Sequence, residues 1–103
     1  MSEAQERIKK AVEENKIIIF MKGTPEMPRC GFSAATVEVL KTLEAPFAAV
    51  DVLTDPEVWA GVKEYSNWPT IPQVFIDGKF IGGCDIVREM HAKGELAPLV
   101  PAE

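Results

Sequence analysis

The seven residues KIIIFMK, at positions 16–22, constrain the fold more than any other part of the sequence. The residues between the two lysines are all apolar and rich in β-branched side chains, which is typical of a strand with no face turned to water. A strand of this kind lies in the interior of a sheet that is covered on both faces. We therefore predict that residues 16–22 form the central strand of a sheet flanked by helices.

The rest of the sequence switches between helical and strand spacing of its apolar residues, and it contains no internal repeat. In chain order, this spacing predicts a helix at 4–12, the strand at 16–22, a helix at 30–43, a strand at 46–52, a helix at 55–65, two strands within 73–83, a helix at 85–93 and a short helical tail at 95–100. The strand–helix–strand unit implies that the first two strands are parallel. The pair Asp77-Gly78 favours a tight antiparallel hairpin between the last two. The predicted fold class is α/β with a mixed sheet.

Length and charge limit the functions that the chain can have. A chain of 103 residues fits one domain over residues 1–103. The formal net charge of −5 argues against binding to nucleic acid, because that binding needs clustered lysine and arginine. No apolar run reaches the roughly 20 residues that a membrane span requires, and the first ten residues lack the apolar core of a signal peptide. We expect a cytoplasmic protein that binds neither nucleic acid nor membrane.

The two cysteines, Cys30 and Cys84, are too few for a disulfide scaffold. Cys30 follows a loop rich in glycine and proline and precedes a predicted helix. Unpaired N–H groups and the positive end of the helix dipole stabilise a thiolate at such a position, and Lys22 and Arg29 add positive charge nearby. Because the thiolate is both the nucleophile and the metal ligand, we predict that Cys30 is the reactive residue.

Four short motifs stand apart in the sequence: MKG at 21–23, CGFS at 30–33, WPTIPQ at 68–73 and GGCD at 82–85. Together they resemble the monothiol glutaredoxins over nearly the whole chain. The resemblance implies a thioredoxin-like fold with a central four-stranded mixed β-sheet flanked by helices, as one glutaredoxin domain over residues 1–103. It also implies a [2Fe–2S] cluster that bridges a homodimer, with the apo protein a monomer. In such a dimer the cysteine of each CGFS motif and the thiol of one glutathione per subunit ligate the cluster. The implied partners are BolA-like proteins and apo iron–sulfur proteins.

Ser33 stands where a dithiol pair carries its second cysteine. That second thiol attacks the mixed disulfide formed by the first, and a hydroxyl cannot do so. A lone thiolate of low pKa suits ligation of a soft metal centre whose other ligands come from elsewhere. We interpret the protein as a carrier that binds the cluster through Cys30 and transfers it to acceptor proteins. The alternatives are a glutathione-dependent thiol–disulfide oxidoreductase of weak activity, with Cys30 catalytic, and a redox-inactive interaction domain.

The resemblance further implies a glutathione site. Lys22 is expected to pair with the glycine carboxylate of glutathione. Ile71 precedes Pro72, and a cis peptide bond there leaves the Ile71 backbone free to pair with the cysteine part of the ligand. Cys84 and Asp85, at a predicted helix start, are expected to offer N–H groups to the γ-glutamyl carboxylate, and Asp85 is expected to bind its ammonium group.

Several residues near these motifs have two interpretations. Cys84 suits packing as well as ligand contact, and Trp68 and Pro69 either pack their loop or border the site. Family members commonly carry an arginine in the third helix at the position of Trp59, and Lys63 lies one turn further along the same face. We expect this departure to give weaker or differently posed glutathione binding.

Overall fold

The computed structural model describes residues 2–101, and residues 1, 102 and 103 of the predicted domain lie outside the described residues. The elements in chain order are α1 (Glu3–Glu14), β1 (Ile17–Met21), α2 (Gly31–Thr42), β2 (Ala48–Asp51), the 3-10 turn η1 (Val52–Thr54), α3 (Pro56–Ser66), β3 (Gln73–Ile76), β4 (Lys79–Gly82), α4 (Cys84–Ala92) and the 3-10 turn η2 (Ala97–Leu99). The predicted alternation of helices and strands is confirmed. No helix within residues 2–101 has both the length and the apolar character needed to cross a membrane.

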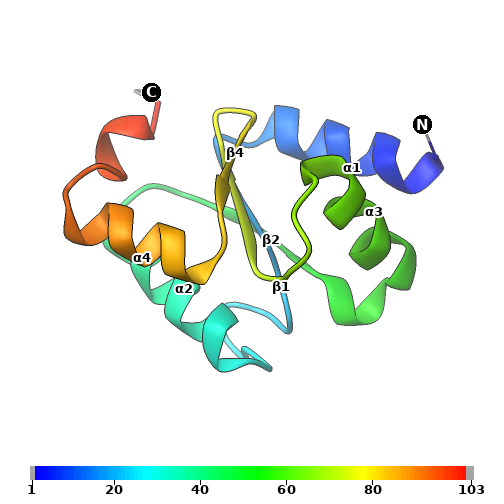
Figure 1. Ribbon diagram of the computed structural model, residues 1–103, viewed down its shortest axis with the longest axis horizontal. Coiled ribbons are helices and arrows are strands. Elements are labelled where there is room, and N and C mark those ends of the chain that lie inside the picture. Colours follow the sequence, from blue (N-terminus) through cyan, green and yellow to red (C-terminus); the bar gives the residue numbers. More distant parts are fainter. Residues whose placement is uncertain (1, 102–103) are drawn as a thin grey trace.

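The sheet has the strand order β2-β1-β3-β4, so β1 has a neighbour on each side (Figure 1). β1 pairs in parallel with β2 and antiparallel with β3, and β3 and β4 form the antiparallel hairpin. Every residue of β1 is buried. The prediction of a central strand at residues 16–22 is therefore confirmed, and the mixed character of the sheet with it.

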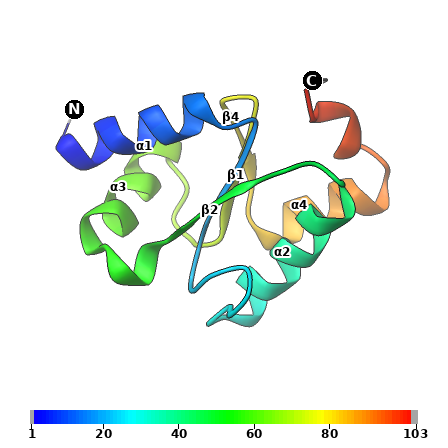
Figure 2. The same cartoon turned by 180° about the vertical axis from the view of Figure 1, so that it is seen from behind.

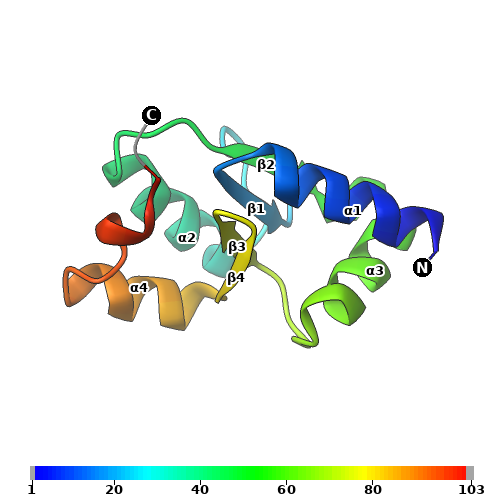
Figure 3. The same cartoon turned by 90° about the horizontal axis from the view of Figure 1, so that it is seen from above.

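The side chains of β1 divide the core into two parts, because successive residues of a strand point to opposite faces. Ile17, Ile19 and Met21 belong to a cluster that also includes residues of α2 and α4. Ile18 and Phe20 belong to a second cluster that includes residues of α1 and α3. The helices accordingly form one layer on each face of the sheet, α1 with α3 and α2 with α4 (Figures 1 and 3).

Capping and turn residues determine where several helices and strands begin and end. Two of these features differ from the prediction. Asp55 caps α3 by accepting a hydrogen bond from the Val58 N–H at 3.2 Å, and Asp77 and Gly78 take the positive φ angles of 53° and 77° that a tight hairpin turn requires. α4 begins at Cys84, one residue earlier than predicted, because Gly83 occupies the N-cap position. The turn η1 was not predicted, since three residues give no apolar period to detect.

Candidate functional site

The segments that adjoin the ends of the four strands meet at one edge of the sheet. Because β1 and β2 run parallel, both end at this edge, and the antiparallel β3 begins there while β4 ends there. Lys22 therefore follows β1 at the same edge where Pro72 precedes β3 and Gly83 follows β4. This topology explains how motifs far apart in the sequence come to surround one place.

The loop at 22–29 folds back on itself and returns the chain to the end of β1, as Figure 2 shows from behind. The Arg29 N–H donates to the Lys22 carbonyl at 2.8 Å, and the Gly23 N–H donates to Asp51 Oδ1 at 3.0 Å. Gly23 has a φ of 90°, and a Cβ there would lie 2.5 Å from the Met27 carbonyl oxygen, so only glycine fits. The loop thus has a fixed shape that sets Cys30 beside Lys22.

Cys30 is the N-cap residue of α2 and is partly exposed. Its sulfur makes no capping hydrogen bond of ordinary geometry. The backbone N–H of Ser33 is nevertheless the largest influence lowering the pKa of the Cys30 thiol, and partial burial opposes it. The Phe32 N–H, the charge of Lys22 and the Ser33 hydroxyl lower the pKa further, whereas Arg29 is not among the contributing groups. The helix start therefore favours the thiolate, as the sequence predicted.

The hydroxyl of Ser33 has a structural role that the sequence did not reveal. Ser33 is completely buried, and its Oγ accepts a hydrogen bond from the Lys22 N–H at 3.1 Å. The same hydroxyl is one of the groups that lower the pKa of the Cys30 thiol. Ser33 thus joins the end of β1 to Cys30, in the position where a second thiol would stand in a dithiol pair.

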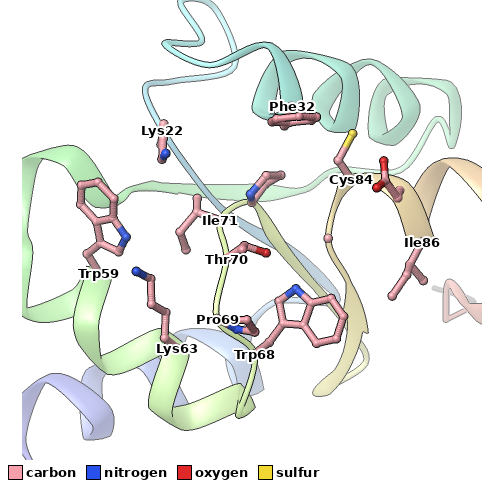
Figure 4. A pocket seen from close by; sticks show the side chains of 13 residues that line it. Lys22, Phe32, Trp59, Lys63, Trp68, Pro69, Thr70, Ile71, Cys84 and Ile86 are labelled. Atoms are coloured by element: carbon pink, nitrogen blue, oxygen red, sulfur yellow. The ribbon is translucent and has the colours of Figure 1, made fainter.

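A pocket of about 440 Å³ lies at this edge (Figure 4). Its lining contains all of the residues that the sequence assigned to ligand binding, namely Lys22, Ile71, Cys84 and Asp85. The other lining residues are Phe32, Trp59, Lys63, Trp68, Pro69, Thr70, Pro72, Gly83 and Ile86. Cys30 is not among the lining residues, whereas Phe32, two residues further along the chain, lines the pocket and is 63% exposed. Phe32, Thr70 and Ile86 were not predicted, because nothing in their residue types separates them from packing residues.

The segment at 68–72 forms one wall of the pocket. The peptide bond between Ile71 and Pro72 is cis, as predicted. The buried Gln73 side chain donates to the carbonyl oxygens of Trp68 at 3.0 Å and Thr70 at 3.1 Å, and so holds the segment in place. Trp68 both packs, with its ring 5.6 Å from that of Phe80, and lines the pocket, so the two interpretations of this residue are compatible.

Trp59 and two lysines form the opposite end of the pocket. The Nζ atoms of Lys22 and Lys63 each lie 5.4 Å from the centroid of the Trp59 ring, within the range of a cation–π contact. At the other end, Cys84 is 6% exposed and begins α4, with Asp85 next to it. Among residues 2–101, no three histidine, cysteine, aspartate or glutamate side chains are grouped so as to hold a metal ion.

Comparison with known proteins gives the family. The glutaredoxin family model matches residues 17–81. A Synechocystis protein described as an uncharacterized monothiol glutaredoxin, ycf64-like, is 51% identical over 95% of this chain and 92% of its own length. This chain belongs to the monothiol glutaredoxins. Glutaredoxin 4 of Escherichia coli K12 is 47% identical over 97% of the chain and 87% of its own length.

Solved structures confirm the thioredoxin-like fold of this monothiol glutaredoxin. The solution structure of reduced poplar apo GrxS14 has a TM-score of 0.82 and 48% identity, and the match covers 93% of this chain and 88% of that one. The crystal structure of a buckwheat glutaredoxin–glutathione complex has a TM-score of 0.83 and 28% identity, covering 94% and 86% of the two chains. The four-stranded mixed sheet between helices is thus the glutaredoxin arrangement, as predicted.

Proposed function

We propose that this monothiol glutaredoxin carries a [2Fe–2S] cluster between two subunits and transfers it to acceptor proteins. The observation that carries the proposal is the environment of Cys30, a partly exposed thiol with a lowered pKa and with a buried serine in place of a second thiol. A thiolate of this kind is a ligand for a soft metal centre, and it has no neighbouring thiol on its helix that would convert it into a disulfide.

The number of available thiols supports a bridged arrangement. A [2Fe–2S] cluster is held by four thiolate-type ligands, whereas the sequence has only Cys30 and Cys84, and Cys84 is buried. One chain therefore supplies one partly exposed thiolate. Two chains and two molecules of glutathione complete the set, so the proposal includes a homodimer that forms with the cluster and a monomeric apo protein.

The pocket supports glutathione as the small thiol. Glutathione has a carboxylate at each end, and the pocket has the cation of Lys22 at one end and the N-terminus of α4 at the other. Between them, Ile71 before the cis peptide bond has a backbone suited to pairing with the cysteine part of the ligand. The N–H groups at Cys84 and Asp85 suit the γ-glutamyl carboxylate, and the Asp85 carboxylate suits the ammonium group. The buckwheat relative, which was solved with glutathione, supports this assignment.

The proposal extends to partners and place in the cell. A carrier of this type delivers its cluster to apo iron–sulfur proteins, and BolA-like proteins are the proposed heteromeric partners. We place the protein in the cytoplasm, where a reducing environment keeps Cys30 as a thiol. We also propose that residues 1–103 act as one glutaredoxin domain.

The second candidate function is removal of glutathione from protein thiols, and the same lowered pKa of Cys30 favours it. The Cys30 thiolate attacks the glutathione sulfur of a protein–glutathione disulfide, the protein thiolate leaves, and Cys30 becomes the mixed disulfide. A second glutathione thiolate then releases oxidised glutathione and restores Cys30. Because Ser33 cannot speed this release, we expect the activity to be weak.

Anaerobic cluster reconstitution tests the first function. With glutathione present, the wild-type protein is expected to gain the visible absorbance of a [2Fe–2S] cluster and to shift to a dimer in size-exclusion chromatography. Cys30→Ser is expected to lose that absorbance with the fold intact, whereas the matched Cys84→Ser keeps a substantial part of it. Full absorbance in Cys30→Ser, or in the wild type without any small thiol, would refute the proposal. Complete loss in a folded Cys84→Ser would move the ligand role to Cys84.

A further inference from the structure

Two lysines from distant elements converge on one indole ring. Lys22 follows β1 and Lys63 belongs to α3, yet each ammonium nitrogen lies 5.4 Å from the centre of the Trp59 ring. Figure 4 shows the two side chains approaching Trp59 from different sides at one end of the pocket. The contacts therefore fix the place of two cations that long flexible side chains would otherwise leave unspecified.

No carboxylate of the described part of the chain forms an ion pair with either of these two cations. Among residues 2–101, neither Lys22 nor Lys63 forms an ion pair, although Lys41 and Lys93 pair with glutamates at 3.4 and 3.0 Å. Two like charges that share one ring repel each other, and an anion placed between them removes that repulsion. This end of the pocket is therefore suited to a negatively charged group of a ligand.

The Trp59 ring is held by packing, which leaves its π-system to the lysines. Trp59 is half-buried and packs against the core cluster between the sheet and α1 with α3. Its Nε1 is buried and has no hydrogen-bond partner among residues 2–101, so the position of the ring rests on packing. The packed ring thus presents a neutral π-surface to the two cations.

We propose that Trp59 is a positioning residue. Its ring holds Lys22 and Lys63 as a pair of cations that binds the glycine carboxylate of glutathione. The inference rests on the proposed glutathione site and adds Lys63 as a second contact to the carboxylate. Trp59 thus has a role of its own: it organises the carboxylate site, in addition to replacing the arginine that family members commonly carry there.

A glutathione derivative that lacks the charge of the glycine carboxylate provides the test. The Cys30 thiol is equilibrated with oxidised glutathione or with the disulfide of glutathione monoethyl ester, which is uncharged at the glycine end, and mass spectrometry gives the fraction of mixed disulfide. The measured quantity is the ratio of the equilibrium constants for glutathione and for the ester. In the wild type we expect this ratio to exceed unity by about tenfold.

Substitutions of Trp59 and Lys63 distinguish an effect of the aromatic face from an effect of packing. Trp59→Leu and Lys63→Met are each expected to lower the ratio by about fivefold, whereas Trp59→Phe, which keeps an aromatic face, stays within about twofold of the wild type. The double variant Trp59→Leu with Lys63→Met is expected to lose less than the product of the two single losses, because both act on one contact. Tyr65→Leu is the matched control, since it truncates another half-buried aromatic residue of α3 that lies outside the pocket, and it should leave the ratio unchanged.

Three results would overturn this inference. Equal losses for glutathione and the ester in Trp59→Leu would show that Trp59 acts through packing alone. A lowered ratio in Tyr65→Leu would show that the effect comes from repacking of α3. A wild-type ratio near unity would show that no carboxylate is bound there. All three leave the cluster proposal standing, because cluster reconstitution with glutathione tests that separately.

Discussion

At the scale of single residues, the Ser33 hydroxyl connects Lys22 with Cys30. It accepts a hydrogen bond from the Lys22 N–H and contributes to lowering the pKa of the Cys30 thiol. The sequence predicted the low pKa of Cys30 from its place at a helix start. It did not predict the contribution of Ser33, because the direction of this side chain depends on how α2 packs against the end of β1.

The pH dependence of Cys30 alkylation tests this account. Because the thiolate is the reacting form, the rate is expected to rise with pH around a midpoint below that of cysteine in an unfolded peptide. Ser33→Ala removes one contributor and should move the midpoint upward, although not to the peptide value, since the backbone N–H groups remain. Peptide mapping separates Cys30 from the buried Cys84. An unchanged midpoint in Ser33→Ala would contradict the role given to the hydroxyl.

The lowered pKa of Cys30 also makes the free energy of unfolding depend on pH. The folded state has the lower Cys30 pKa, so unfolding takes up a proton at pH values between the folded and unfolded pKa. The stabilising contribution is therefore complete above the pKa of the unfolded thiol and is lost as the pH falls through the pKa of the folded one. Ser33→Ala should diminish this rise in stability with increasing pH.

At the scale of elements, Asp51 connects the end of β2 to the loop at 22–29. Its Oδ1 accepts hydrogen bonds from the N–H of Gly23 at 3.0 Å and from that of Leu53 at 2.9 Å. One carboxylate oxygen thus holds the loop before Cys30 and starts the turn η1. The sequence predicted the loop from its glycine and prolines, and it predicted a helix over residues 55–65. It did not predict this anchor, because the two partners are 28 residues apart.

Replacement of Asp51 measures what the anchor contributes. Asp51→Ala leaves two N–H groups without their acceptor and is expected to lower the free energy of unfolding by about 2 kcal/mol, as is typical of hydrogen bonds to a charged group. Asp51→Asn is the matched control, since it keeps one carbonyl oxygen and should lose less. Urea denaturation gives both values. Equal stability of the alanine variant and the wild type would show that the loop holds its shape without Asp51.

At the scale of the whole molecule, the apolar residues of β1 determine the layers. Because both faces of β1 are buried, helices cover the sheet on each side, and this could be predicted from residues 16–22 alone (Figure 1). The position of the β3–β4 hairpin beside β1 could not be predicted in this way, since the apolar spacing of a strand does not reveal which strand it pairs with. The resemblance to glutaredoxins implied a four-stranded mixed sheet, and the structure gives the strand order. The motifs likewise predicted which residues gather at the pocket, but not the contact of Lys22 and Lys63 with Trp59, which depends on how α3 lies relative to the end of β1.

The central claim is that one partly exposed thiolate per chain, that of Cys30, makes the cluster a bridge between two chains. Native mass spectrometry of the protein reconstituted with glutathione tests it most directly, because the mass gives the number of chains, cluster atoms and small thiols in a single particle. The account predicts two chains, one [2Fe–2S] cluster and two molecules of glutathione, and only monomers of Cys30→Ser. A cluster bound to a single chain, or to a dimer that contains no glutathione, would contradict it.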